Sequence, residues 1–295
     1  MGKAVHEASP AARAVYAAAD EALGDPISKL CFEGPIETLT LTAVTQPAIV
    51  ATSSALVAAL REAHPGVEPA FAAGHSLGEY SALVAAGALA AEDAVRLCRL
   101  RGQAMQDAVP AGQGAMAAIM GLDPQALEAV CAEAAEGEVV SPANFNAPGQ
   151  IVIAGHAGAV ARASEKVAGR GGKAIPLKVS APFHCALMRP AAARLAPELA
   201  ALAVSPLAFP VIANVDAEPN ADPARVVDLL VRQIDGPVQW VKTIERMAAE
   251  GVTHALELGT GKVLAGLVKR IAKQIKVLNV GDPEGISKVP AFLES

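Results

Sequence analysis

The chain of 295 residues contains 53% hydrophobic and 18% charged residues. This length supports one large domain, or a large domain with a smaller one, and excludes a peptide hormone, a zinc finger or a disulfide knot. The formal net charge is -6, and no block of consecutive Lys or Arg occurs, which excludes the usual electrostatic footprint of a nucleic-acid-binding protein. We therefore expect small molecules or proteins as partners.

Cysteine spacing and the absence of targeting signals exclude further classes of protein. The four cysteines lie far apart and form no C-x-x-C pair, so we predict neither a metal site nor a disulfide framework, and no cofactor. The first residues carry charges where a signal peptide needs an apolar core. The apolar run 82–91 reaches about half of the roughly 20 residues that a membrane span needs. We predict a cytoplasmic, soluble monomer that does not cross a membrane.

Helical and extended segments alternate from the start of the chain. Ser9 and Pro10 indicate the N-terminus of a first helix, and Gly24 indicates its end. The next predicted elements are a helix over 47–63, a strand over 69–73, a helix after a sharp turn at 74–80, and a helix over about 92–109. Pro110 and Gly114 then mark a break.

The middle of the chain predicts a small domain of its own. The order there is strand 115–121, helix 124–135, strand 139–145, strand 150–154, helix 157–169 and strand 173–179. This β-α-β-β-α-β order is typical of a ferredoxin-like fold. We place it at residues 112–180, as an insertion between two parts of a larger domain, 1–111 and 181–295.

The remaining third of the chain resumes the alternation. We predict helices over about 188–202, 222–234, 238–250 and 262–273, and strands over 210–215, 254–258 and 276–280. Alternating helices and strands favour an α/β fold with a parallel sheet in the large domain.

The sharpest chemical signal is the G-x-S-x-G pattern from Gly74 to Gly78, which lies between a predicted strand and a predicted helix. A serine at such a turn is exposed at the top of the sheet, and we expect the two glycines to be needed because the turn leaves no room for side chains. The following helix directs backbone N–H groups at an oxyanion formed there. We predict that Ser76 is a nucleophile.

A serine nucleophile needs a base, and the residues alone leave the choice among six histidines open. His75 adjoins the serine, but neighbours at such a turn diverge, so we expect it to support the loop. His184 lies in an irregular segment where the small domain returns to the large one, a favoured place for a site. For His6, His64, His156 and His254 we expect solvated or packed imidazoles.

Arg101 lies on the helix after the one that follows Ser76. Most helical arginines are solvated, but an inward guanidinium would suit a substrate carboxylate held by two hydrogen bonds.

Six segments carry a family resemblance: GHSLGEYSALVAAGAL, LCRLRGQAMQDAVPAGQGAMAAIMGL, VVSPANFNAPGQIVIAG, VSAPFHCALMRPAA, LLVRQIDGPVQW and LELGTGKVLAGLVKRI. In order and spacing they resemble the malonyl-CoA:acyl carrier protein transacylases of bacterial fatty-acid synthesis. The resemblance implies an α/β-hydrolase-like large domain with a ferredoxin-like insertion. It also implies transfer of a malonyl group from malonyl-CoA to the phosphopantetheine thiol of acyl carrier protein, a transient partner.

The resemblance assigns roles residue by residue. Ser76 is similar to the family's nucleophile and His184 to its base. Gln233 resembles the residue whose main-chain carbonyl orients that histidine. Arg101 matches the arginine that pairs with the malonyl carboxylate, and Leu77 matches the residue whose backbone N–H forms half of the oxyanion hole.

Further positions carry weaker implications. Asn144 and Asn146 lie in the family's Asn-x-Asn stretch along the cleft, and with His75 we expect them to line the substrate site. The loop 181–184 resembles the malonyl-selective version. Because acyl carrier proteins are acidic, we expect docking on a local basic patch, with the candidates Lys173, Lys178, Arg189, Lys262, Lys269 and Arg270.

Two departures from the family pattern stand out. Thr260 replaces a proline that is usual in the family. The family also begins with a strand and a Gly-Gln-Gly-Ser-Gln loop that supplies the second oxyanion N–H, and neither is found in this sequence. Loss of one such donor costs about 3 kcal/mol. The sequence is therefore also compatible with an amino-terminally truncated form of impaired activity.

Two different enzyme classes would share parts of this pattern. A serine hydrolase would use the same G-x-S-x-G with His254 as the base and Asp216 or Asp228 as the acid. An acyltransferase of polyketide synthesis would share the chemistry of a malonyl transferase.

Overall fold

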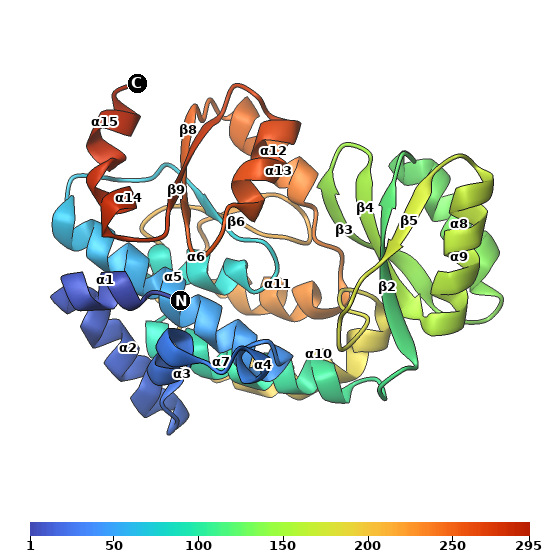
Figure 1. The fold of residues 1–295 in the computed structure, drawn as a ribbon, viewed down its shortest axis with the longest axis horizontal. Helices are drawn as coiled ribbons and strands as arrows, with labels where there is room; N and C mark the ends of the chain where they lie inside the picture. The colour runs from blue at the N-terminus through green and yellow to red at the C-terminus, as the bar shows by residue number, and fades with distance from the viewer.

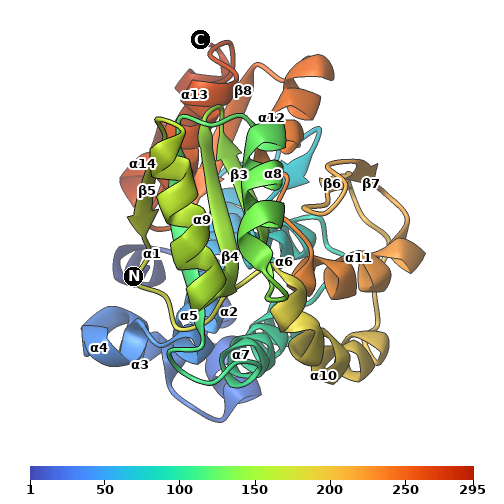
Figure 2. The same cartoon turned by 90° about the vertical axis from the view of Figure 1, so that its right-hand side faces the viewer.

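The structure is a computed structural model that describes residues 1–295. It is a mixed α/β fold, as predicted, with a helix-rich body on one side and a four-stranded sheet on the other (Figure 1). The helices α8 (Pro124–Ala135) and α9 (Ala157–Gly169) cover the outer face of that sheet, away from the body (Figures 1 and 2). The two parts have separate apolar cores, of which the larger contains 40 buried residues.

The four-stranded sheet confirms the predicted β-α-β-β-α-β order. Its strands are all antiparallel and lie in the order β3-β4-β2-β5. This is the order expected of a ferredoxin-like arrangement. The elements are β2 (Gly114–Met120), α8 (Pro124–Ala135), β3 (Val140–Ala147), β4 (Gln150–His156), α9 (Ala157–Gly169) and β5 (Lys173–Pro176).

The parallel sheet predicted for the large part is present only as two separate pieces. In one, β1 (Ala72–Ala73) pairs in parallel with β6 (Val211–Ile212), and β7 (Pro219–Asn220) adds an antiparallel strand. In the other, β8 (His254–Leu258) pairs in parallel with β9 (Lys276–Val280).

The strands β1 and β6 are shorter than the predicted 69–73 and 210–215. Gly74 begins a sharp turn directly after β1. Pro210 directly precedes β6 and has no N–H to donate to a neighbouring strand. These two residues therefore limit the length over which the strands pair.

The two sheet pieces lie between the same two apolar layers. On one side Ala72 of β1 and Leu256 of β8 both pack against the largest core cluster. On the other side Ala73 and Ala255 both pack against a cluster that contains Trp240. The pieces therefore share one layer of the fold, and β1 and β8 each have an edge without a strand partner.

A buried helix pair forms the centre of the large part: α5 (Thr42–Ala63) packs along α7 (Ala91–Asp107). A Cβ on Gly102 would lie 2.7 Å from the Ala43 Cα, so glycine permits this close crossing. α5 is the one helix long and apolar enough to cross a membrane, and 72% of its apolar window is buried within the protein. The apolar surface of α5 therefore packs in the core. The apolar run 82–91, which the sequence analysis named, is shorter than this helix.

The remaining helices complete the body. Ser9 caps α2 (Pro10–Leu23) by accepting the Ala12 N–H, and Gly24 ends it with φ 59°, as predicted. Five short helices were not predicted from the sequence: α1 (Lys3–Ala8), α3 (Ile27–Glu33), α4 (Ile36–Leu39), α14 (Pro283–Ser287) and α15 (Val289–Leu293). The others are α6 (Gly78–Ala85), α10 (Arg189–Ala200), α11 (Pro223–Asp235), α12 (Trp240–Ala249) and α13 (Val263–Ile271).

Candidate active site

Ser76 lies in the turn between β1 and α6, and its φ of 54° is in the left-handed region. A residue other than glycine adopts such a φ only where the surrounding structure holds it. A Cβ on Gly74 would lie 1.9 Å from the backbone of Gly78, so Gly74 must be a glycine. A Cβ on Gly78 would meet no atom within 4 Å. The expectation that both glycines are sterically required is therefore wrong for Gly78.

Ser76 and His184 are joined, as predicted from the resemblance. The Ser76 hydroxyl donates to His184 Nε2 at 2.7 Å. The other ring nitrogen, Nδ1, donates to the carbonyl oxygens of Gln233 at 3.0 Å and Gly236 at 3.2 Å. Because both carbonyls only accept hydrogen bonds, Nδ1 carries the proton and Nε2 is free to take one from serine.

The surroundings of His184 keep its ring neutral. The residue is 3% exposed, and its φ of 59° turns it inward from the loop after β5. Burial, helped by the positive charge of Arg101, lowers the pKa of His184 to about 3. A lowered pKa means that the unprotonated form is present throughout the neutral range, which is the form that a general base requires.

Arg101 is buried, at 1% exposure, and its guanidinium reaches Ser76. Its Nη2 donates to Ser76 Oγ at 3.1 Å and to Gln233 Oε1 at 2.8 Å, and its Nη1 donates to Gln46 Oε1 at 2.7 Å. The Tyr80 ring centre lies 5.8 Å from Cζ.

No carboxylate forms an ion pair with Arg101, and its Nε has no hydrogen-bond partner. A buried cation without a counter-ion is costly. The site can therefore receive an anionic group beside Ser76.

The backbone N–H of Leu77 has no acceptor within the chain. It precedes the first residue of α6, where the helix N-terminus adds a partial positive charge. This free donor, one residue after Ser76, can donate a hydrogen bond to an oxyanion formed beside Ser76.

Two polar residues behind the turn, Glu79 and Asn214, were not predicted from the sequence. Asn214 accepts the Ser76 N–H at 2.7 Å and donates to the Gly74 carbonyl at 2.7 Å. Glu79 accepts the Asn214 N–H at 3.0 Å and the Gln233 side-chain amide at 2.8 Å. The only signal in the sequence was the position of Glu79 three residues after Ser76.

Of the three other predicted site residues, two are joined to the turn. His75 Nε2 donates to Asn146 Oδ1 at 2.8 Å, and burial lowers the pKa of His75, so the turn is tied to β3 by a neutral imidazole. Asn144 is buried on β3 beside Val238 and forms no side-chain hydrogen bond with Ser76 or His75.

The structure does not bring together the residues expected of a serine hydrolase. His254 lies in β8 with its Nδ1 3.0 Å from the Thr253 hydroxyl, and its ring packs on Phe292. Asp216 and Asp228 pair with surface arginines, so neither orients a catalytic histidine. The expectation that His254 could serve as the base is wrong. No three His, Cys, Asp or Glu side chains lie close enough to hold a metal ion.

Comparison with known proteins gives the family. The acyl transferase domain family matches residues 1–282. The malonyl CoA-acyl carrier protein transacylase of Escherichia coli K12 is 50% identical over 279 residues, which are 94% of this chain and 90% of that protein. The chain belongs to the malonyl CoA-acyl carrier protein transacylase family.

Solved structures of related transferases have the same fold. An acyl carrier protein S-malonyltransferase from Vibrio cholerae superposes with a TM-score of 0.95 at 47% identity, covering 98% of this chain and 94% of the other. A malonyl-transacylase in complex with a type II polyketide synthase acyl-carrier protein superposes with a TM-score of 0.94 at 42% identity, covering 100% and 95%. The resemblance read from the six sequence segments is thus confirmed.

The unequal surroundings of the two glycines give a prediction for this transacylase-family turn. We expect Gly74→Ala to lower the free energy of unfolding by about 1–3 kcal/mol, because the new methyl group overlaps backbone. Gly78→Ala is the matched control and should change it by less than about 1 kcal/mol. Chemical denaturation of both variants measures the difference. Equal effects would contradict the geometry of the turn.

Proposed function

We propose that the chain transfers a malonyl group from malonyl-CoA to the phosphopantetheine thiol of acyl carrier protein, through a malonyl ester on Ser76. The observation that carries the proposal is the buried Arg101 guanidinium, which has no counter-ion and lies 3.1 Å from the Ser76 hydroxyl oxygen. A malonyl group presents a carboxylate two carbons away from the carbonyl that serine attacks, so one ligand can satisfy both residues.

In the first half-reaction His184 Nε2 takes the proton of the Ser76 hydroxyl while Oγ attacks the thioester carbonyl carbon. The carbonyl oxygen becomes an oxyanion, for which the Leu77 N–H is the available backbone donor. The C–S bond then breaks, and the proton on His184 passes to the departing CoA sulfur. The Gln233 and Gly236 carbonyls stabilise the imidazolium that forms between these two steps.

The second half-reaction reverses this chemistry with a different thiol. His184 takes the proton of the phosphopantetheine thiol, and the sulfur attacks the ester carbonyl of malonyl-Ser76. The C–O bond to Oγ breaks, and His184 returns its proton to the serine oxygen.

We further propose that Asn146 and His75 line the substrate cleft, because they form one unit with the nucleophile turn. For Asn144 the support is its place on the same strand as Asn146. The proposed boundaries of the small domain, 112 and 180, are supported by a separate apolar cluster that the elements from β2 to α9 form.

The acyl carrier protein would dock on exposed cations around the site. Of the six predicted candidates, Arg189 pairs with Asp235, and Arg270 bonds Gln150 and the Pro148 carbonyl. The four lysines form no ion pair, which makes them the stronger candidates: Lys173, Lys178, Lys262 and Lys269.

We propose that the enzyme works as a cytoplasmic monomer without a cofactor.

Ser76→Ala tests the covalent intermediate. We expect the wild-type protein to gain the mass of one malonyl group after incubation with malonyl-CoA, and the variant to gain none, because Ser76 carries the hydroxyl that bonds Nε2 of the His184 base. Intact-protein mass spectrometry measures the adduct. A malonyl adduct that persists at full occupancy in the variant would place the nucleophile elsewhere.

Substitution of Arg101 tests the specificity. In Arg101→Ala we expect malonyl transfer to fall by more than about tenfold while acetyl transfer is retained or improved, because an acetyl group leaves the guanidinium unpaired. Arg101→Lys keeps the charge but loses the two-pronged geometry, so its loss should be intermediate. Rates of acyl-enzyme formation from the two CoA esters give the ratio. A parallel fall for both esters would reject the assignment.

A further inference from the structure

A buried carboxylate behind the active site has no part in the chemistry proposed above. Glu79 is 2% exposed and lies on the first turn of α6, three residues after Ser76. No Lys, Arg or His lies within ion-pair distance of it. Its Oε2 accepts two hydrogen bonds, from the Gln233 amide at 2.8 Å and the Asn214 backbone N–H at 3.0 Å. Burying such a group is costly unless those bonds serve the fold or the site.

The first bond leads to the carboxylate-binding arginine. The Gln233 amide nitrogen donates to Glu79 and to the Ser76 carbonyl, and its Oε1 accepts from Arg101 at 2.8 Å. The guanidinium only donates, and both nitrogen partners accept, so the amide has one possible orientation. This role belongs to the Gln233 side chain and is separate from that of its main-chain carbonyl, which accepts from His184.

The second bond leads to the nucleophile. Glu79 fixes the Asn214 backbone, and the Asn214 side chain in turn accepts the Ser76 N–H and donates to the Gly74 carbonyl. These bonds hold the left-handed conformation of Ser76. One carboxylate oxygen therefore supports both the nucleophile turn and the residue that orients the arginine.

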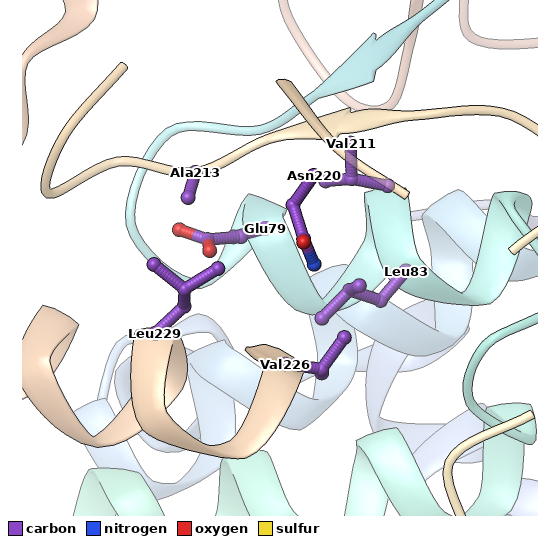
Figure 3. A pocket seen from close by; sticks show the side chains of 7 residues that line it. All are labelled: Glu79, Leu83, Val211, Ala213, Asn220, Val226 and Leu229. Atoms are coloured by element: carbon purple, nitrogen blue, oxygen red, sulfur yellow. The ribbon is translucent and has the colours of Figure 1, made fainter. Parts of the chain in front are cut away.

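Glu79 also lines a cavity of about 10 Å³ (Figure 3), whose other walls are mostly apolar but include the side chain of Asn220. That volume holds about one water molecule. Ser76, His184 and Arg101 do not line it, so Glu79 does not reach the substrate directly.

We propose that Glu79 is a positioning residue that acts through Gln233: the amide between them orients the Arg101 guanidinium while leaving its charge for the substrate carboxylate. A carboxylate in direct contact with Arg101 would orient it equally well but would neutralise it. A neutral amide spacer avoids that conflict. This inference rests on the proposed function, since it assigns a purpose to the unpaired charge of Arg101.

An exchange of the two side chains tests the spacer. Glu79→Gln together with Gln233→Glu conserves composition and shape but puts the carboxylate against Arg101. We expect the ratio of malonyl to acetyl acyl-enzyme formation to fall at least about tenfold, the effect of losing a charged hydrogen-bonded partner. Glu79→Gln alone keeps an acceptor oxygen for both bonds and should hold the ratio within about threefold. Glu245→Gln, on the exposed face of α12, is the control.

Rates from malonyl-CoA and acetyl-CoA, with thermal unfolding of each variant, decide the outcome. An exchange variant that unfolds cooperatively and keeps the wild-type ratio would overturn the proposal. If the exchange variant does not fold, Gln233→Leu is the deciding variant, because it keeps the main-chain carbonyl that accepts from His184. We expect a raised KM for malonyl-CoA with little change for acetyl-CoA. An unchanged ratio of malonyl to acetyl acyl-enzyme formation would overturn the proposal that Glu79 acts through Gln233. A wild-type protein that forms no malonyl-serine would refute the proposed function as well.

Discussion

The guanidinium of Arg101 is the charge around which the site is arranged. It is buried, it has no carboxylate partner, and it is held by Ser76, Gln46 and Gln233. Each of these contacts joins Arg101 to a residue that is far away in the sequence. Gln46 reaches it because Gly102 lets α7 cross close to the start of α5. A fold that had only to be stable would place a counter-ion here, and its absence is the clearest sign of an anionic substrate.

The positive charge of Arg101 also affects the proposed nucleophile, Ser76, and the proposed base, His184. Burial, together with this charge, lowers the pKa of His184, which keeps the imidazole unprotonated. Its bond to Ser76 Oγ stabilises negative charge on the serine oxygen as the proton leaves. Burial raises the pKa of Glu79 to about 7, although the positive charge of Arg101 acts to lower it. The proposed nucleophile, base and specificity residue are thus electrostatically coupled.

Local sequence patterns predicted much of this structure, and the failures have physical causes. Helix caps such as Ser9, and the order of strands and helices in the four-stranded sheet, depend on neighbours along the chain. Local sequence patterns were therefore sufficient to predict them. His184 could be chosen only through the family resemblance, because 108 residues separate it from Ser76. Glu79 and Asn214 were missed because their role depends on contacts across 135 residues between residue types that are common everywhere. The parallel strands were overestimated because pairing ends at Gly74 and Pro210.

A crystal structure of the malonyl-serine form would show whether Arg101 binds the malonyl carboxylate. We predict that the malonyl carboxylate accepts two hydrogen bonds from Arg101 at about 2.7–2.9 Å. We also predict that the ester carbonyl oxygen lies within hydrogen-bond distance of the Leu77 N–H. A malonyl carboxylate that points to solvent, with Arg101 still bonded to the oxygen of Ser76, would contradict this role of Arg101.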